Sequence, residues 1–400
     1  MENPKIRFKG YTKDWEQRKL GDMGSTFTGL SGKTKEDFGH GDAQFITYMN
    51  VFSNPVANLE MTEAVEIDAK QNRVKKGDVF FTTSSETPEE VGMSCVMPEN
   101  KDNIYLNSFC FGYRPTEKFD LDYLAYVLRA DSFRKEMKFL AQGISRYNIS
   151  KNKVMEVSIP IPNLEEQTMV GRYFSTLDHL ITLHQRKCEQ TKKLKKYMLQ
   201  KMFPQNGAKV PEIRFDGFTY DWEQRKLGDV FKEYSEKNHT ELSALTIIQG
   251  GGTVKREDSD RNLMYDTSNL SNYKMVRKDD FIVHLRSFEG GLEKSSLDGI
   301  ISPAYHTFHS DMADSRFYYP YFRSYEFIKH KLVSHVYGIR DGRSIDIDGM
   351  KTIEIPYTSI EEQRKIGDYL ECLDHLITLH QRKCDELKKM KKYMLQNMFI

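Results

Sequence analysis

The chain has 400 residues, more than a single hydrophobic core usually serves, so its length predicts two or more domains. Lys and Arg (59) nearly balance Asp and Glu (58), and a nucleic-acid contact would therefore have to rest on local basic patches. The sequence has no run of 18 apolar residues and starts without the apolar stretch of a signal peptide, so we expect a cytoplasmic protein without membrane spans.

The first half opens with residues 1–22, which we call a constant segment because the second half repeats much of its sequence. It continues into a module, residues 23–147. In this module, GDVFFTTSS from Gly77 is typical of a strand followed by a loop. The stretch LDYLAYVLRADSFRKEMKFLAQG from Leu121 predicts one helix that stops at a glycine. These signals predict a mixed α/β domain with short strands and many turns.

A constant region, residues 148–204, follows and predicts a long helix. Asn163 stands three positions before Glu166, which is the capping-box pattern of a helix start, and no proline interrupts the sequence from Leu164 to about Phe203. Such a helix would be roughly 60 Å long at 1.5 Å per residue. An apolar stripe at helical spacing predicts that one face is buried. The stripe consists of Leu177, Ile181, His184, Cys188, Thr191, Leu194, Met198 and Met202.

The second half repeats this order with a different module. The opening sequence IRFKGYTKDWEQRKLGD returns as IRFDGFTYDWEQRKLGD, and LDHLITLHQRKC at 177–188 returns unchanged at 373–384. Ser359 and Glu362 repeat the capping pattern, and DDFIVHLRS from Asp279 again predicts a strand and a loop. The parts of this half are the opening segment 205–229, the module 230–344 and the final constant region 345–400.

Two copies of one plan are too few for a solenoid, whose units of roughly 20 to 50 residues need at least three copies. The repeat instead indicates a fused dimer with pseudo-two-fold symmetry. We predict an α+β fold in which two globular mixed α/β domains are joined by a pair of long antiparallel helices, a coiled coil. Lysine runs on both helices are interpreted as a solvated face, with a phosphate contact left open. The runs are Lys192, Lys193, Lys195, Lys196 and Lys388, Lys389, Lys391, Lys392.

The sequence carries no recognisable catalytic constellation. GLSGKT from Gly29 has the Gly-Lys-Thr of a phosphate loop, but its two glycines stand too close together. His179 and His184 are five positions apart, which directs them to different faces of a helix and not to one metal ion. The five cysteines show no zinc-type spacing. We therefore predict a protein that is not an enzyme and that itself binds no metal and no cofactor.

Taken together, the duplicated elements resemble the specificity subunit of a type I restriction-modification system. The resemblance is carried by DWEQRKLGD at the start of each half and by the exits PNLEEQ and PYTSIEEQ. It is also carried by the LDHLITLHQRK helices, which end in KKYMLQKMF and KKYMLQNMF. It covers the whole chain, and its specificity lies in the order and duplication of all these elements.

The resemblance implies that each module is a target-recognition domain that reads one half of a bipartite, asymmetric site in double-stranded DNA. It implies that the helical pair sets the unread spacer and that the constant regions dock two methyltransferase subunits, which bind S-adenosylmethionine. The complete enzyme would add two restriction subunits that use ATP and Mg. This chain would then supply recognition without chemistry.

Base edges are read mainly by Arg, Lys, Asn, Gln and short polar side chains, and phosphates are held by Lys, Arg and backbone amides. We therefore predict that DNA binds at loops rich in such residues, above all QGISRYNIS and YGIRDGRSIDI, which stand at matching places in the two modules. In the first module the candidates are Ser31, Lys33, Thr34, Lys35, Tyr48, Asn50, Ser84, Ser85, Glu86, Thr87, Arg146, Tyr147 and Asn148. In the second they are Lys237, Asn238, His239, Lys255, Arg256, His284, Arg286, Ser287, Arg340, Arg343 and Ser344.

Two other functions stay open at this point. A coiled-coil scaffold whose modules bind proteins or glycans would need no basic loops at matching positions. A self-sufficient restriction enzyme would need methylation and nuclease motifs, which the sequence does not show. A steep fall of DNA affinity with rising salt would separate a DNA-binding protein from the scaffold.

Overall fold

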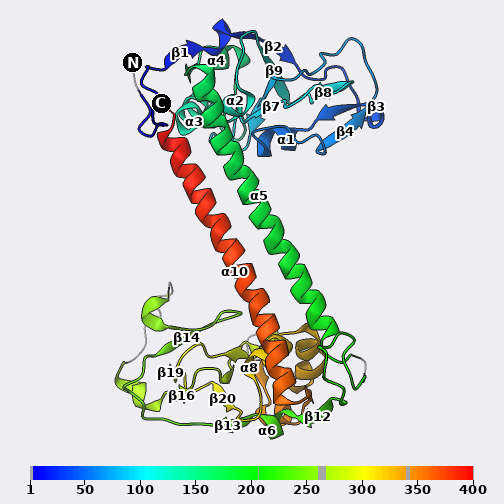
Figure 1. Ribbon diagram of the computed structural model, residues 1–400, viewed down its shortest axis with the longest axis vertical. Helices are drawn as coiled ribbons and strands as arrows, with labels where there is room; N and C mark the ends of the chain where they lie inside the picture. Colours follow the sequence, from blue (N-terminus) through cyan, green and yellow to red (C-terminus); the bar gives the residue numbers. More distant parts are fainter. Residues whose placement is uncertain (1–2, 206, 260–266, 339–342, 400) are drawn as a thin grey trace. The chain divides into compact units, whose positions relative to one another are not determined.

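The computed structural model describes residues 3–205, 207–259, 267–338 and 343–399, and its chain forms two compact units (Figure 1). Unit 1 contains Met1–Gln185 and Arg382–Ile400, and unit 2 contains Arg186–Gln381. Each unit holds one mixed module of strands and short helices and a part of both long helices. The predicted α+β fold with an internal repeat is confirmed.

Unit 1 is built on a four-stranded sheet in the order β2-β9-β5-β7 and a three-stranded sheet in the order β4-β3-β8. The central strand β5, VFFT, is buried along its whole length, which explains the apolar run Val79–Phe81. Its elements are β1 (Glu16–Lys19), β2 (Gly24–Thr28), β3 (Phe38–Ile46), α1 (Tyr48–Ser53), β4 (Thr62–Val65), β5 (Val79–Thr82), β6 (Ser84–Ser85), β7 (Ser94–Val96), β8 (Ile104–Leu106), β9 (Cys110–Pro115), α2 (Leu121–Val127), α3 (Asp131–Leu140), β10 (Tyr147–Asn148), α4 (Lys151–Met155), β11 (Ser158–Ile161) and the first part of α5 (Leu164–Lys201).

Unit 2 has one four-stranded sheet in the order β13-β20-β17-β18, and several two-stranded pairs surround it. Its elements are β12 (Glu223–Lys226), α6 (Leu227–Val230), β13 (Lys232–Tyr234), β14 (Leu245–Ile248), β15 (Gly252–Lys255), β16 (Lys274–Val276), β17 (Phe281–Val283), α7 (Ser287–Gly290), β18 (Glu293–Lys294), β19 (Gly299–Ile301), β20 (His306–His309), α8 (Ser315–Phe322), β21 (Val336–Tyr337), β22 (Ser344–Ile345), α9 (Ile347–Lys351), β23 (Glu354–Tyr357) and the first part of α10 (Ile360–Asn397).

The strand that enters each module pairs with the strand that leaves it. In unit 1, β1 and β11 are antiparallel, from Glu16 opposite Ile161 to Lys19 opposite Ser158. In unit 2, β12 and β23 pair from Glu223 opposite Tyr357 to Lys226 opposite Glu354. The repeat therefore forms the same closure twice, and different modules are inserted between corresponding ends.

Both long helices begin where the sequence predicts, but the capping box is only half correct. The backbone N–H of Glu166 donates to the side chain of Asn163 at 2.9 Å, and that of Glu362 donates to Ser359 at 3.3 Å. The Glu carboxylates do not complete the box. Each is buried and receives two hydrogen bonds from an arginine of the opening segment, at 2.6 and 2.8 Å. The arginines are Arg7 in unit 1 and Arg214 in unit 2.

The long helices pack antiparallel, and their cross-helix ion pairs repeat with two-fold symmetry. In unit 2, Lys195 of α5 contacts Asp374 of α10 at 2.6 Å. In unit 1, Lys391 of α10 contacts Asp178 of α5 at 2.6 Å. Because Lys391 and Asp374 occupy the places of Lys195 and Asp178 in the repeat, the same contact forms twice, as at an isologous dimer interface. The interpretation of the lysine runs as a purely solvated face is wrong for these two lysines.

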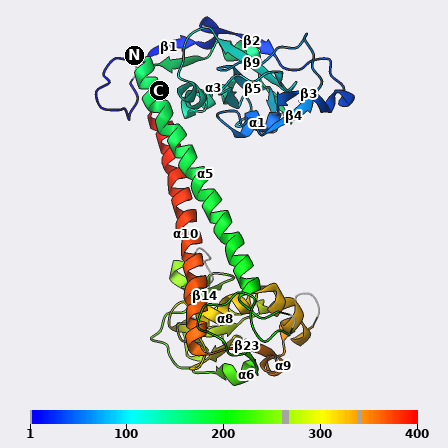
Figure 2. The ribbon, with the colours of Figure 1, turned by 45° about the vertical axis from the view of Figure 1, so that its right-hand side comes forward.

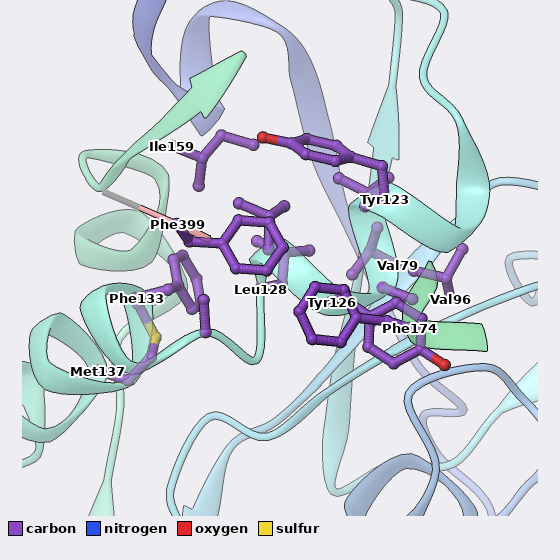
Figure 3. Packing of buried hydrophobic residues seen from close by; sticks show 14 of the residues in the cluster. Val79, Val96, Tyr123, Tyr126, Leu128, Phe133, Met137, Ile159, Phe174 and Phe399 are labelled. Carbon is purple, nitrogen blue, oxygen red and sulfur yellow. The ribbon is translucent and has the colours of Figure 1, made fainter. Parts of the chain in front are cut away.

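The end of each long helix completes a module core. In unit 1, Phe399, after α10, is 5% exposed and lies within 5.5 Å of the ring of Phe174 and 5.8 Å of that of Tyr123 (Figure 3). In unit 2, Phe203, after α5, lies 4.8 Å from the ring of Phe317. The backbone N–H of Ile6 also donates to Asn397 at 2.9 Å. The two ends of the chain therefore meet in unit 1, as Figures 1 and 2 show.

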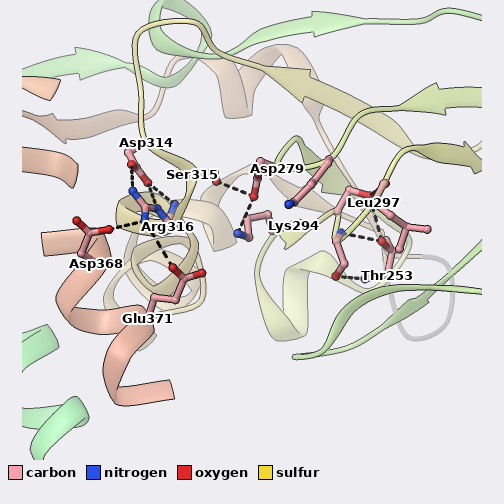
Figure 4. Close-up of polar contacts among 12 residues, drawn as sticks. Thr253, Asp279, Lys294, Leu297, Asp314, Ser315, Arg316, Asp368 and Glu371 are labelled. Carbon is pink, nitrogen blue, oxygen red and sulfur yellow. Dashed lines mark hydrogen bonds and ion pairs between the residues drawn. The ribbon is translucent and has the colours of Figure 1, made fainter. Parts of the chain in front are cut away.

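Helix α2 of the first module and helix α8 of the second are each attached to the long helix that follows the module, α5 or α10. Asp120 before α2 and Asp314 before α8 each donate a backbone N–H to a glutamine of that helix, Gln167 or Gln363. In unit 2, Arg316 also pairs with Asp314 and with Asp368 and Glu371 of α10 (Figure 4). These contacts fix each module on its own long helix.

The single helix predicted from Leu121 is wrong, because the chain forms two helices there. Ala130 takes an extended conformation between α2 and α3. Beside it, half-buried Arg129 donates to the carbonyl oxygens of Ser94 and Asn54, and desolvation lowers its pKa to about 10. A helix through this point would lose these contacts, which no local sequence signal reveals.

Candidate nucleic-acid interface

Three of the predicted loop clusters meet at one place in unit 1. Strand β10 pairs with β6, with Tyr147 opposite Ser85 and Asn148 opposite Ser84. The hydroxyl of Tyr48 donates to the carbonyl oxygen of Ser84 at 2.7 Å. This surface, which we call the first loop surface, presents exposed polar side chains beside these strands. The exposed candidates on it are Glu86, Thr87, Arg146 and Asn148.

Other candidates in this region serve the fold and do not face solvent. Asn50 is fully buried, donates to the carbonyls of Asn58 and Met61 and accepts the N–H of Asn58. Ser84 and Ser85 are buried, and the Ser85 hydroxyl donates to Glu90 at 3.2 Å. The polar atoms of Asn50 are therefore used inside the module, and a contact of Asn50 with DNA stays a prediction. Ser84 and Ser85 hold the loops in place.

The loop at residues 31–35 is a separate polar segment. Lys33 is mostly buried and pairs with Asp68 at 3.1 Å and Asp37 at 3.8 Å. The backbone N–H of Lys70 and the ammonium of Lys33 lower the pKa of Asp68 to about 2. Ser31, Thr34 and Lys35 are exposed. Among the described residues, no hydrogen bond or ion pair joins this loop to β6 or β10, so the structure does not bring these candidates to the first loop surface.

A second loop surface forms in unit 2 where α7 packs against β22. The guanidinium of Arg343 lies 4.4 Å from the ring centre of Phe288 and 3.5 Å from Glu289. Arg286, directly before α7, is exposed. Ser344, half-buried, pairs with Tyr337 of β21. Arg286, Arg343 and Ser344 are thus held together, whereas Arg340 lies outside the described residues.

Two further candidates of this surface have structural contacts. Ser287 is fully buried, and its hydroxyl accepts the backbone N–H of His284 at 2.9 Å. Burial, with the charges of Arg323 and Arg286, lowers the pKa of His284 to about 4. His284 is therefore neutral near pH 7, and Ser287 positions the start of α7 without facing solvent.

The remaining candidates of the second module lie in other segments. Lys237, Asn238 and His239 follow β13, where Asn238 has a left-handed backbone with φ 69° and His239 lies 3.1 Å from Glu241. Lys255, at the end of β15, pairs loosely with Glu257 at 3.8 Å, and the Arg256 guanidinium lies 5.5 Å from the ring of Tyr273. These five residues stay predictions, because no contact in the structure assigns them to a nucleic acid.

The described parts of the loops QGISRYNIS and YGIRDGRSIDI lie at matching positions of the two modules, and residues 339–342 of the second loop lie outside the described residues. In the first, the backbones of Gln142 and Asn148 exchange hydrogen bonds of 2.9 and 2.8 Å. In the second, Tyr337 pairs with Ser344. Each loop leads directly into the short helix before the exit strand, α4 or α9. The two loop surfaces are therefore built at equivalent points of the repeat from different residues.

We expect Arg146→Ala and Arg343→Ala each to weaken binding of duplex DNA by about 1 to 3 kcal/mol if these side chains reach base edges. Titration of labelled duplex at several salt concentrations measures this. A base contact would relax specificity at one position, whereas a phosphate contact would weaken all sequences equally and lower the salt slope by about 1. Arg172→Ala on α5, also exposed, is the control. Unchanged affinity in both variants would remove these arginines from the interface.

Sequence reasoning missed the turn between β14 and β15, which adjoins α7. A Cβ built on Gly290 of α7 would stand 2.2 Å from the side-chain nitrogen of Gln249. The run of three glycines after Gln249 was a signal for a sharp turn, but it carried no indication of the neighbouring element.

In the part of the chain that the structure describes, no group of three or more His, Cys, Asp or Glu side chains could hold a metal ion. Among the described helices, none is both long enough and apolar enough to cross a membrane. The geometry thus defines a protein with two different polar loop surfaces on a duplicated frame.

A model of one known protein family matches both halves of the chain. The model of the type I restriction modification DNA specificity domain matches residues 12–193 and again residues 220–389. The chain therefore belongs to this family and contains two copies of its domain.

Individual relatives agree over most of the chain. A protein of Methanocaldococcus jannaschii assigned as the MjaX type I restriction enzyme specificity subunit is 26% identical, over 96% of this chain and 92% of its own. The MjaVIII specificity subunit of the same organism is 27% identical over 68% of each chain. Among solved structures, the type I restriction-modification S subunit from M. genitalium has a TM-score of 0.61 at 14% identity, covering 100% of this chain and 99% of its own. These likenesses confirm the fold of a specificity subunit.

Proposed function

We propose that this chain is the DNA-recognition subunit of a type I restriction-modification enzyme and that each module reads one half of a bipartite site. The observation that carries the proposal is the pair of different loop surfaces at equivalent points of one repeated frame. A protein that recognised one symmetric target would need two equal surfaces. Two unequal surfaces suit an asymmetric site of two parts.

The constant regions are proposed to bind two methyltransferase subunits. The repeat exposes matching apolar residues near the ends of the two long helices, Leu194 and Tyr197 on α5 and Met390 and Tyr393 on α10. In unit 2, a cavity of about 950 Å³ also opens beside Phe203 and Trp222, at the end of α5. The corresponding exposed apolar residues on the two helices suit two copies of one partner.

The chemistry is proposed to reside on partner subunits. S-adenosylmethionine would bind to the methyltransferase subunits, and ATP and Mg would bind to two restriction subunits of the complete enzyme. This assignment would place the protein in the cytoplasm with its DNA. Duplex DNA and S-adenosylmethionine mixed with the isolated chain should then give no methylation.

Exchange of one module is the direct test of the proposal. We expect that replacing residues 23–147 by the corresponding module of another family member changes one half of the methylated motif and leaves the other half intact. The physical reason is that the β1–β11 closure and the helix ends, which would stay in place, do not depend on the module's loops. Genome-wide mapping of methylated bases, in cells that also carry the methyltransferase subunit, measures the motif.

The same experiment separates the alternatives. If both halves of the motif changed together, the assignment of one module to one half-site would be wrong. If the parent complex bound duplex DNA without a fall in affinity as salt rises, the scaffold function would be favoured, because counterion release accompanies contacts to phosphates.

A further inference from the structure

We propose that Gln249 is a base-reading residue of the second module and that its amide contacts the edge of an adenine. The inference deepens the proposed function and rests on it. Two observations support it. A hairpin turn is held in one position by hydrogen bonds to the buried carboxylate of Glu293, and the Gln249 side chain packs against α7.

The turn has a backbone that fixes where Gln249 stands. Strands β14 and β15 pair up to Ile248 opposite Gly252, so residues 249–251 form the connection. Gly250 and Gly252 have φ angles of 81° and 74°, in the left-handed region that favours glycine. Gln249 is the first residue of this connection and is exposed.

The carboxylate of Glu293, in β18, binds the backbone of the turn and fixes its position. This carboxylate is fully buried and accepts the backbone N–H of Gly250 at 2.6 Å and that of Gly252 at 3.3 Å. It also accepts the hydroxyl of Tyr319 at 2.8 Å and forms an ion pair with Arg323. A buried charge is costly unless it is well paired, and closing a hairpin does not require one. The network therefore points to a need for a rigid turn.

The Gln249 side chain is placed over α7 because α7 ends in a glycine. At Gly290, a Cβ would stand 2.2 Å from the Gln249 nitrogen, so any other residue would displace the amide. No hydrogen bond of this amide is found among the described residues. The amide thus keeps its donor and its acceptor for a ligand while packing restricts its position.

The neighbours of Gln249 suit nucleic acid. Arg286 stands directly before α7, and the guanidinium of Arg343 lies over the ring of Phe288, which belongs to α7. Both cations can hold phosphates, whereas a glutamine amide can form two hydrogen bonds with adenine, to N6–H and N7. The second loop surface therefore combines cations suited to phosphates with a side chain suited to one base.

The test uses the full chain in complex with its methyltransferase subunit. We expect Gln249→Ala to lower the preference for adenine at one position of the second half-site by about 5- to 150-fold, as for loss of a bidentate contact. The first half-site should stay unchanged, and so should the salt dependence, since no charge is lost. Methylation mapping and duplex binding with each base at that position measure both.

Gly290→Ala is the second variant, because its methyl group should push the flexible amide aside while all Gln249 atoms remain. It should reproduce the loss of preference with a melting temperature close to that of the parent. Gln190→Ala, an exposed glutamine on α5, is the control and should change nothing.

The outcomes distinguish the two levels of the proposal. If the parent complex modifies a bipartite motif and neither variant alters it, Gln249 does not read a base and only this inference falls. If the parent complex gives no bipartite motif, DNA recognition by the two modules is itself wrong, and the inference falls with it.

Discussion

Phe399→Ala should destabilise unit 1 by about 3 to 5 kcal/mol, the cost of removing a buried phenylalanine. Phe399 stacks on Phe174 with their rings 5.5 Å apart and also contacts Trp15 and Tyr123. The cavity would lie in the core shared by the opening segment, α2 and both long helices. Urea unfolding, combined with hydrogen exchange of individual amides, measures the loss and shows which unit opens.

The repeat supplies a matched variant for this prediction. Phe203→Ala should destabilise unit 2 in the same way, because Phe203 lies between Trp222, Phe317 and Tyr321. Tyr393→Ala, on the exposed face of α10, should change the stability by less than about 0.5 kcal/mol. An effect of Phe399→Ala no larger than that of Tyr393→Ala would show that the chain end does not support the core of unit 1.

Inserting the same four helix-forming residues after Gln185 in α5 and after Gln381 in α10 should lengthen the unread gap of the DNA site. These positions mark the boundary between the two units, so the ion pairs Lys195–Asp374 and Lys391–Asp178 stay within their own units. Four residues add about 6 Å at 1.5 Å per residue. Since a base pair occupies about 3.4 Å, we expect one or two extra base pairs and unchanged half-sites.

Methylation mapping of the doubly extended chain decides whether the helices measure the spacer. An active complex with an unaltered gap would show that they join the modules without setting their distance. An insertion in α5 alone is the control. It shifts the register of one helix only, and we expect it to lower stability and activity without producing a new motif.

The features predicted correctly from the sequence depend on local signals. Asn163 and Ser359 mark helix starts because a side chain caps the N–H three positions later, and this rule needs no tertiary contact. The duplicated stretches predict a two-fold frame because equal sequences in equal surroundings fold equally. The family follows from the order of these stretches.

The features predicted wrongly depend on contacts between distant parts of the sequence. The carboxylate of Glu166 binds the guanidinium of Arg7, which is distant in the sequence. The carboxylate therefore does not accept the backbone N–H of the N-cap residue, the second bond of a capping box. Arg129 interrupts the predicted helix because the carbonyl groups it binds belong to other strands and loops. Asn50 has a residue type suited to DNA, but its side chain makes three hydrogen bonds with Asn58 and Met61, in the loop after α1.

The same difference between local signals and contacts of distant residues applies to the two candidate loop surfaces. Loop composition located Arg146, Arg286 and Arg343, which are exposed. It could not separate them from Lys33, whose charge is used by Asp68 inside the module. It also missed Gln249, since the importance of this residue depends on Glu293 and Gly290, which lie elsewhere in the sequence.

The division of the chain has a consequence for its synthesis. Unit 2 is one continuous stretch, Arg186–Gln381, whereas unit 1 needs Arg382–Ile400 to complete its core. A ribosome adds roughly 5 to 20 residues per second, so the first module must wait about 13 to 50 s after residue 147 has been added for Phe399 to arrive. The module made second can finish folding first. A nascent or prematurely terminated chain therefore carries an unfinished first module with its apolar core open, a form suited to chaperone binding and proteolysis.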